Sequence, residues 1–357
     1  MQHLDLKSRG AGLNTPNRFE PLYIDYSDEN LEEYFDDLED TKRIKTQFFN
    51  DTTKSILAKN DSPDLGFTYS INPYRGCEHG CIYCYARPTH EYLGFSAGLD
   101  FETKIMVKRD AAKLLEEAFS KKSWEPQTIM FSGNTDCYQP VERKLNITRA
   151  CLEVFLKFRN PVGVITKNAL IQKDIDILKQ LNELNIVTAV ISVTTLKREL
   201  SRKFEPRTSV PLKRLETIYK LSSNGIPTGV NVAPIIPGLN DEEIPAILKA
   251  ASENGAKFAG RIILRLPYSV KDLFLDWLKR NYPEKASKII SRIHDVRKGQ
   301  LNSAEWGKRF SGEGEYAEHI HKLFKISCEK YGLNKEKFKI RTDLFRRVKM
   351  EQEELFG

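Results

Sequence analysis

Short apolar runs alternate with segments of helical period along the middle of this 357-residue chain. The runs are rich in Val, Ile and Thr, which favour strands. They cover Thr128–Phe131, Val162–Thr166, Val187–Val193, Thr228–Ala233 and Ile262–Leu266. A continuous apolar run is typical of a parallel strand that is buried on both faces. The alternation therefore predicts a parallel sheet covered by helices.

Apolar residues at helical spacing mark the segments between the runs. One stripe consists of Ile171, Ile175, Leu178 and Leu181, and another of Leu212, Leu215, Ile218 and Tyr219. Asn224-Gly225 and Asn254-Gly255 are helix-stop signals. Asn240 with Glu243 predicts a capping pair at the start of the helix between them.

The pattern divides the chain into three parts. Residues 1–60 are polar, with an acid-rich stretch at 25–39, and we expect an N-terminal arm that is loosely structured or wraps around the rest. Residues 61–285 carry the β/α alternation. Residues 286–357 are charged and helical in pattern, with a glycine-rich interruption at 310–316, and we expect a helical C-terminal extension.

Charge and hydropathy limit the partners and the cellular compartment that we expect for this protein. The formal net charge of +7 permits contact with nucleic acid but is as readily a solvated surface. No apolar run approaches the roughly 18 residues that cross a bilayer, so we expect no membrane partner. Residues 1–7 hold no apolar signal core, which favours a cytoplasmic protein without disulfides.

Three cysteines carry the strongest chemical signal. Cys77, Cys81 and Cys84 stand at CxxxCxxC spacing, after a strand-like run at 67–71 and Gly76. So short a loop can point three thiolates at one inorganic cluster. Iron–sulfur cubanes normally take four thiolates. A three-thiolate loop leaves one iron open to a small molecule.

A zinc site is the alternative for the same cysteines, with His79 or His90 as the fourth ligand. Structural zinc sites favour paired CxxC hooks, and the sequence has none, so a cluster is the better interpretation. A non-enzymatic protein that binds zinc and nucleic acid stays open as a second class of function.

Polar residues follow the apolar runs, where the chemistry of β/α folds is placed. The first run ends in Ser132–Asp136, whose hydroxyl, amide and backbone groups suit a charged amino acid moiety, although a hydrogen-bonded turn is the alternative. The next run ends in Lys167, whose ammonium needs an anion or water. A third leads to Ser192.

The cysteine spacing, with the aromatic Tyr83 before the last cysteine, resembles the signature of the radical S-adenosylmethionine enzymes. The resemblance implies a [4Fe–4S] cluster held by Cys77, Cys81 and Cys84, with S-adenosylmethionine on the open iron. One electron, supplied by a partner such as flavodoxin or ferredoxin, would release a 5′-deoxyadenosyl radical that abstracts hydrogen from a substrate. It also implies a partial (β/α)6 TIM-type barrel.

Further segments are similar to the spore photoproduct lyase branch of these enzymes, namely residues 132–136, 165–167, 192, 204–209 and 232–234. Residues 72–77 and 297–302 are closer still to an uncharacterised bacterial group within that branch. The resemblance implies cofactor contacts for Tyr83, Ser132, Gly133, Asn134, Thr135, Asp136, Lys167 and Ser192. The Gly-Gly-Glu motif that many members carry at the first polar strand end is absent.

The hydrogen donor of the DNA-repair lyase is a cysteine just before its Ser/Asp motif, and the matching place near Ser132 has no thiol. Cys137 lies four residues past Gly133. It either faces the active site as a catalytic residue, with Tyr138 as a hydrogen relay, or is a small buried residue. The substrate therefore stays open between a DNA photoproduct, with base flipping, and a protein, tRNA or small molecule.

Overall fold

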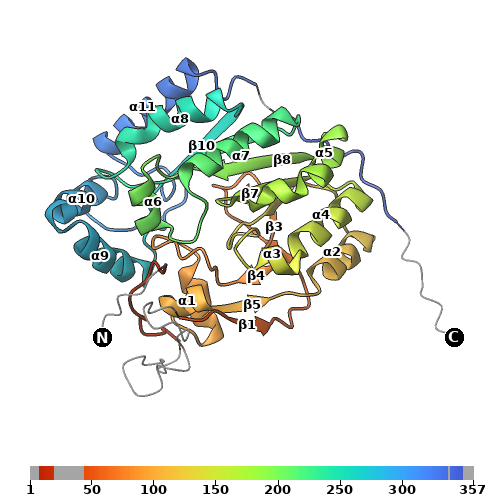
Figure 1. The fold of residues 1–357 in the computed structure, drawn as a ribbon, viewed down its shortest axis with the longest axis horizontal. Coiled ribbons are helices and arrows are strands. Elements are labelled where there is room, and N and C mark those ends of the chain that lie inside the picture. Colours follow the sequence, from red (N-terminus) through yellow and green to blue (C-terminus); the bar gives the residue numbers. More distant parts are fainter. Residues whose placement is uncertain (1–7, 20–43, 337, 349–357) are drawn as a thin grey trace.

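The computed structural model describes residues 8–19, 44–336 and 338–348, so the acid-rich stretch at 25–39 lies outside the described residues. Its main sheet has seven strands in the order β10-β9-β8-β7-β6-β3-β2 (Figure 1). Every neighbouring pair is parallel except β2 with β3 at one edge. The bounds are β2 Leu57–Lys59, β3 Tyr69–Ile71, β6 Ile129–Phe131, β7 Val162–Thr166, β8 Val187–Ser192, β9 Thr228–Ile235 and β10 Phe258–Ile263.

Helices run along the outer side of the curved sheet (Figure 1). They are α2 Ala111–Ser120, α3 Glu142–Leu145, α4 Ile147–Phe158, α5 Ile175–Glu183, α7 Pro211–Ser223, α8 Ile244–Glu253 and α11 Glu315–Lys330, with the 3-10 segments η3 Ala169–Asp174 and η4 Asp241–Glu243. The predicted fold class, α/β with a partial barrel, is confirmed. The strands β10 and β2 stay at opposite edges, so the sheet does not close on itself.

A small second sheet lies beside one end of the barrel (Figure 1). It pairs β1 Gln47–Asn50, β5 Lys104–Val107 and β4 Tyr74–Arg75, and it packs with η2 Arg87–Leu93 and α1 Leu99–Thr103. The helices α6 Arg198–Phe204, α9 Val270–Asn281 and α10 Pro283–Asp295 lie at the left of the same view. Because β4 leads directly into the three cysteines, this sheet fixes where their loop begins.

Most strands lie where the hydrophobic runs placed them, but the last one differs. We expected a strand over Ile262–Leu266, whereas β10 covers Phe258–Ile263. It is an edge strand in which Gly260 is exposed and Arg261 is half-buried, so no apolar run marks its first half. Leu264 and Leu266 are buried beyond the strand, in a second hydrophobic cluster.

Two details of the helix predictions are wrong. In α7, Leu215 and Ile218 are buried, but Leu212 is 78% exposed and Tyr219 is 57% exposed, because the buried face continues toward Leu221 instead. Asn240 and Glu243 form no capping pair. The Asn240 side chain accepts a hydrogen bond from the backbone N of Ile236 at 2.6 Å, and Glu243 binds Thr195 and the backbone of Leu196.

The helix-stop signal at Asn224-Gly225 is confirmed, since α7 ends at Ser223 and Gly225 has a φ of +81°.

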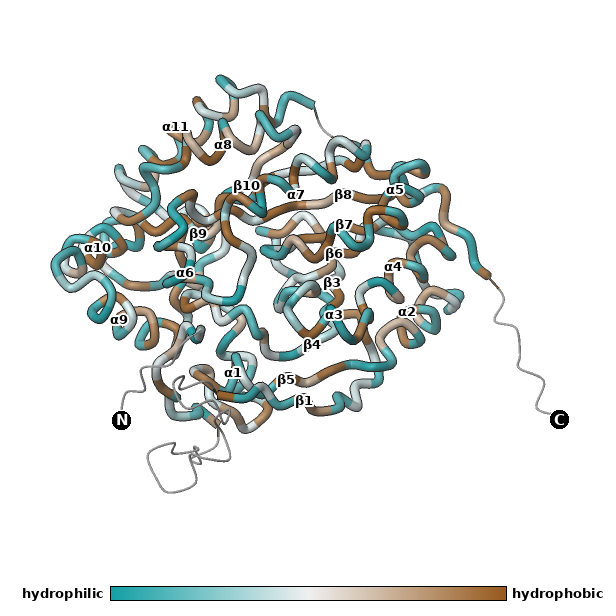
Figure 2. Tube along the Cα trace, viewed as in Figure 1, coloured by the Kyte–Doolittle hydropathy of each residue, from teal (hydrophilic) through white to brown (hydrophobic). Residues whose placement is uncertain are grey.

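Brown, hydrophobic positions gather along β6, β7 and β8 at the centre of the molecule (Figure 2). The helix α11 adds Ile320 and Phe324 to the same hydrophobic cluster. The helix α11 therefore shares the core of the barrel.

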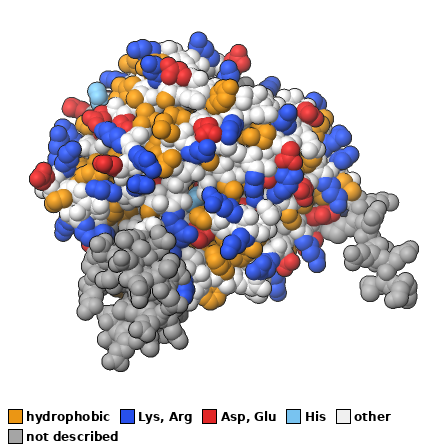
Figure 3. Space-filling view, in the orientation of Figure 1, with side chains coloured by type: hydrophobic (Ala, Val, Ile, Leu, Met, Phe, Trp, Pro, Cys, Tyr) orange, Lys and Arg blue, Asp and Glu red, His pale blue; other side chains and the backbone are white. Residues whose placement is uncertain are grey.

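The face drawn in Figure 3 carries Lys and Arg side chains interspersed with Asp and Glu. The excess of basic residues therefore forms no single-sign surface on that face, as a polyanion-binding groove would require. No helix among the described residues has the length and apolar content to span a membrane.

The buried stripe of α7 can be tested with two substitutions in one helix. Ile218→Ala should destabilise the protein by about 2–5 kcal/mol, because Ile218 is fully buried and its loss leaves a cavity. Leu212→Ala should change stability by no more than about 0.5 kcal/mol. Urea unfolding followed by circular dichroism measures both. Equal effects of the two substitutions would contradict the packing described.

Candidate functional site

One cavity of about 450 Å³ opens at the carboxyl ends of the parallel strands. The cysteine loop forms one wall through the side chains of Cys77, His79, Cys81, Tyr83, Cys84 and Tyr85. The strand ends contribute Ser132, Gly133, Asn134, Thr135, Asp136, Lys167 and Ser192. Every residue that the sequence suggested for a cluster or cofactor therefore lines the same cavity.

Backbone hydrogen bonds hold the cysteine loop in a tight turn. The N–H of Cys77 donates to Phe101 O at 2.9 Å, and the N–H of Gly80 donates back to Cys77 O at 3.3 Å. The N–H of Cys84 donates to Cys81 O at 3.2 Å. Gly80 has a φ of +65°, in the region where only glycine is free of strain. The three thiols consequently face one side of the loop.

An ion pair lies beneath this loop. Arg87 and Glu102 are fully buried and paired with each other. The Nε of Arg87 donates to Cys81 O at 2.9 Å, so the pair is bonded directly to the backbone of the middle cysteine. Glu102 also accepts hydrogen bonds from the backbone N of Gly10 at 3.0 Å and of Ala11 at 2.9 Å.

The N-terminal segment 8–18 is thereby fastened over the cysteine loop. A Cβ at Gly10 would lie 1.9 Å from Gly80 O, and one at Gly80 would lie 2.6 Å from a Glu102 carboxylate oxygen. Such a close approach of the two segments requires glycine at both positions. The segment is a structural cover for the cysteine loop.

His79, between the first two cysteines, is engaged at both ring nitrogens. Its Nδ1 lies 3.4 Å from an Asp136 carboxylate oxygen, and its Nε2 lies 3.1 Å from the side-chain nitrogen of Asn168. Burial alone raises the pKa of Asp136, but His79 and hydrogen bonds from Thr166 and the Lys167 backbone hold that pKa below its ordinary value. Asp136 thus anchors the loop to β7 as an anion.

The segment after β6 is a folded turn. Ser132 has a φ of +75°, and its hydroxyl accepts a hydrogen bond from the Cys137 N–H at 2.7 Å. Thr135 donates to Tyr74 O at 2.7 Å, while the Asn134 side chain is exposed. The backbone carbonyl of Gly133 accepts a hydrogen bond from the Tyr85 hydroxyl. The turn therefore presents backbone groups and one free amide to the cavity.

Lys167 reaches into the cavity beside a buried carboxylate. Its Nζ lies 3.3 Å from Glu205 and donates to Ala233 O at 3.0 Å. Burial raises the pKa of Glu205, but the charges of Arg214 and Lys167 outweigh burial and bring it well below the ordinary value. The expectation that Lys167 needs a ligand anion is therefore incomplete, because the chain itself supplies Glu205.

Tyr83 joins the same network. Its hydroxyl binds Glu205 and lies 3.5 Å from the Thr194 hydroxyl, while its ring packs edge-on against Phe204. The Nζ of Lys167 stands 5.7 Å from the centre of the Tyr83 ring. Tyr83 thus links the cysteine loop to the residues at the strand ends.

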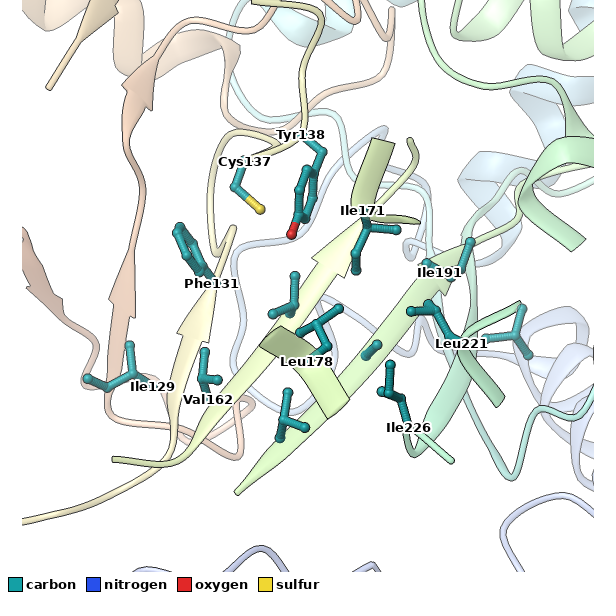
Figure 4. Close-up of a cluster of buried hydrophobic side chains, with 14 of the residues drawn as sticks. Ile129, Phe131, Cys137, Tyr138, Val162, Ile171, Leu178, Ile191, Leu221 and Ile226 are labelled. Atoms are coloured by element: carbon teal, nitrogen blue, oxygen red, sulfur yellow. The ribbon is translucent and has the colours of Figure 1, made fainter. Parts of the chain in front are cut away.

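Cys137 and Tyr138 do not line the cavity. Both are fully buried among hydrophobic side chains, and Figure 4 shows them beside Phe131 and Ile171. The Tyr138 hydroxyl donates to Asp174 at 2.9 Å, and burial raises the pKa of the Cys137 thiol well above its ordinary value. The catalytic roles suggested for them have no geometric support, because the turn after β6 directs these two side chains into the core.

Cys151 and Cys328 are buried too, in α4 and α11. The sequence left the side chains of Asn231 and Arg265, which both line the cavity, without a role. Asn231 sits among apolar neighbours in β9, and Arg265 follows the strand whose bounds were misplaced. For Asn231, a polar residue inside an apolar run was the available signal.

Comparison with known proteins agrees with this geometry. The family model described as "Radical SAM superfamily" matches residues 71–251. The chain belongs to the radical SAM superfamily. It is 33% identical over 258 residues to uncharacterized protein Rv2578c of Mycobacterium tuberculosis, covering 70% of this chain and 75% of that one. It is 28% identical over 226 residues to an uncharacterized protein of Methanocaldococcus jannaschii, covering 63% of this chain and 80% of that relative.

Among solved structures, this radical SAM protein resembles spore photoproduct lyase complexed with dinucleoside spore photoproduct. The TM-score is 0.57, the sequence identity is 17%, and 80% of each chain is covered. At this identity the likeness establishes a shared fold, and it agrees with the partial barrel of the present structure.

The residues present fit the cluster that radical SAM proteins typically carry. Three thiols line one cavity, and the other cysteines, Cys137, Cys151 and Cys328, lie in the core. Burial raises the pKa values of Cys77, Cys81 and Cys84, and metal binding would deprotonate these thiols outright.

The zinc alternative fits less well. His79 is committed to Asp136 and Asn168, and His90 packs between the rings of Phe95 and Phe101.

The buried ion pair beneath the cysteines should control cluster retention. Glu102→Gln leaves Arg87 without its buried carboxylate and weakens the attachment of segment 8–18, so we expect iron content after anaerobic reconstitution to fall several-fold.

Asp174→Asn is the matched control, because Asp174 is an equally buried carboxylate that binds Tyr138 and Arg149 away from the cavity. It should lower the melting temperature and leave iron content unchanged. Iron is measured per folded chain. Equal iron in the Glu102→Gln variant and in the parent protein would refute the role of the pair.

Proposed function

We propose that this protein is a radical SAM enzyme that cleaves S-adenosylmethionine reductively at a [4Fe–4S] cluster and abstracts hydrogen from a substrate in the same cavity. The observation that carries the proposal is the convergence of three thiols and the polar strand ends on one cavity. Its volume of about 450 Å³ falls within the range of small-molecule sites.

Cys77, Cys81 and Cys84 would hold the cluster, which when bound supplies the electron that breaks the carbon–sulfur bond of the cofactor. The protein's own part is positioning and shielding. Buried hydrogen bonds fix the loop from below, through Arg87, and from the side, through His79. A reactive radical requires such a rigid enclosure, because motion of the site would let it react with the protein.

The cofactor's amino acid group would lie against the turn after β6 and Lys167. Asn134 presents an unshared side-chain amide there, and Lys167 presents an ammonium whose internal partner, Glu205, is also paired with Arg214. Ser192 lines the cavity between this group and Asn231, where a ribose hydroxyl would fit. A carboxylate bound at Lys167 would therefore meet a positive charge that Glu205 only partly neutralises.

Reductive cleavage needs one electron from outside the chain. A low-potential redox protein such as flavodoxin or ferredoxin is the class of partner that we propose. The soluble reductant dithionite replaces it in the experiments below.

DNA photoproduct repair is the second candidate, since the neighbouring solved structure is a spore photoproduct lyase bound to a dinucleoside photoproduct. The shared fold supports the general architecture of such an enzyme. The thiol that would serve as hydrogen donor, Cys137, is buried away from the cavity, and this weighs against a repair mechanism of that type.

The cluster assignment is tested by anaerobic reconstitution followed by addition of dithionite and S-adenosylmethionine. The parent protein should be brown and form 5′-deoxyadenosine, and Cys81→Ala should do neither. Cys328→Ala should behave as the parent, because this thiol lies in α11 and contacts Asn334 instead of the cavity. Chromatography quantifies the nucleoside. Absence of 5′-deoxyadenosine from an iron-loaded parent protein would sink the proposal.

The role of Lys167 is tested by Lys167→Met, which keeps the aliphatic stem and removes the charge. We expect S-adenosylmethionine binding to weaken about 10- to 100-fold, the effect of losing one charged hydrogen bond. Lys220→Met on the exposed side of α7 should bind as the parent does. Equilibrium dialysis with labelled cofactor measures the affinity. Equal affinities for the two variants would assign Lys167 to structure alone.

A further inference from the structure

The open side of the barrel is bridged by two loops that come from opposite edges of the sheet. One loop joins β2 to β3, and the other follows α10. Asp64 of the first loop forms an ion pair with Arg309 of the second and accepts a hydrogen bond from the Gly307 N–H. The two loops therefore complete a wall of the cavity where the sheet itself leaves a gap.

Two arginines of this wall have protein acceptors. Arg309 binds Asp64 and Ser62. Arg297 donates to the backbone carbonyls of Leu264 at 2.7 Å and of Lys308 at 3.0 Å. Their guanidinium groups serve to hold the wall together.

Arg265 differs from both. It follows β10 and lines the cavity, and its guanidinium has no hydrogen bond or ion pair with any other residue in ranges 8–19, 44–336 and 338–348. It lies between two aromatic rings, 5.1 Å from the centre of Phe310 and 5.7 Å from the centre of Tyr85. Ring faces attract a cation, but they offer no lone pair to its five N–H donors.

This arrangement is costly without a ligand. Burial lowers the pKa of Arg265, and the like charge of Arg309 lowers it further. Arg265 as a whole is half-buried, but its Nε is withdrawn from water without an acceptor, and an anion in the cavity would supply one. Carboxylate and phosphate match its planar fork best, because they accept two parallel hydrogen bonds.

Aromatic side chains surround the same place. Trp306 is 56% exposed at the cavity, and Phe310 and Tyr85 pack against the guanidinium. A large exposed indole that lines the same cavity as Arg265 provides a stacking surface for a planar ring. One ligand could therefore place a planar ring on Trp306 and a negative charge on Arg265.

We propose that the Arg265 side of the cavity is the substrate site, and that it takes a planar ring bearing an oxyanion, which Arg265 binds and Trp306 covers. This inference rests on the proposed function. Tyr85 places the site, because its ring contacts Arg265, its hydroxyl binds Gly133 at the cofactor turn, and it directly follows Cys84. Substrate and cofactor are thereby separated by one aromatic ring.

The test measures quenching of Trp306 fluorescence in the reconstituted protein saturated with S-adenosylmethionine. Trp306 is exposed, whereas Trp124 and Trp277 are buried, and a Trp306→Phe variant provides the blank. Two matched pairs of probes separate the sources of the oxyanion: uridine 5′-monophosphate against uridine for a phosphate, and nicotinate against nicotinamide for a carboxylate. Pyrimidine and pyridine rings are poor mimics of the cofactor's adenine.

We expect at least one oxyanion to quench saturably, and to bind about 10- to 100-fold tighter than its neutral partner. Arg265→Gln should remove this preference. Arg265→Lys should keep part of it, since the charge stays but the planar fork is lost. Arg292→Gln is the matched control, because Arg292 also lies over a ring, 4.5 Å from the centre of Tyr316, but pairs with Asp295 at the surface.

Three results would overturn the inference: no saturable quenching by either oxyanion, equal binding of the charged and neutral probes, or an unchanged preference in Arg265→Gln. Circular dichroism establishes that each variant is folded. The experiment needs no turnover, so failure of 5′-deoxyadenosine formation in the same preparation contradicts the proposed function and leaves the binding result to be judged by itself.

Discussion

The carboxyl ends of parallel strands meet at one edge of a sheet, and the whole site depends on this constraint. The strands β6, β7 and β8 end in Ser132, Lys167 and Ser192 within one cavity, although these residues are far apart in the sequence. Hydrogen-bonded register permits no other arrangement once the pairing is set. The cysteine loop follows β3 and β4 and enters the same edge, so sulfur ligands and polar strand ends face each other.

Buried ion pairs hold the cysteine loop and the strand ends in place. Glu205 lies at the centre, bonded to Tyr83 of the cysteine loop, Thr194 after β8 and Arg214 of α7, and paired with Lys167. The ion pair of Glu102 with Arg87 likewise holds the cysteine loop from beneath. Removing one partner of a buried pair leaves an uncompensated charge, which costs several kcal/mol. These pairs therefore give the loop one defined position.

The cavity has two chemically different sides. The side of the cysteines and Lys167 is polar, and its three-cysteine loop lies within the segment that matches the radical SAM superfamily. The side of Arg265 and Trp306 is aromatic and holds a cation that has no partner among the described residues, and Trp306 lies on a loop that bridges the open edge of the barrel. In a barrel that does not close, strand pairing does not fix these bridging loops, and the substrate site that we propose lies beside them.

The sequence by itself determined the parallel sheet, most strand positions, the three-cysteine loop and the polar strand ends that line the cavity. These features follow from local rules: apolar runs, helix stops and short-range spacing. It did not determine that Cys137 and Tyr138 point into the core, that Glu205 and Lys167 are partners, or that Arg265 stands unpaired at the cavity. Such facts depend on which distant side chains meet and on the direction of one turn after β6. Only the tertiary structure decides them, because the free energy of a buried charge or thiol is set by its neighbours in space.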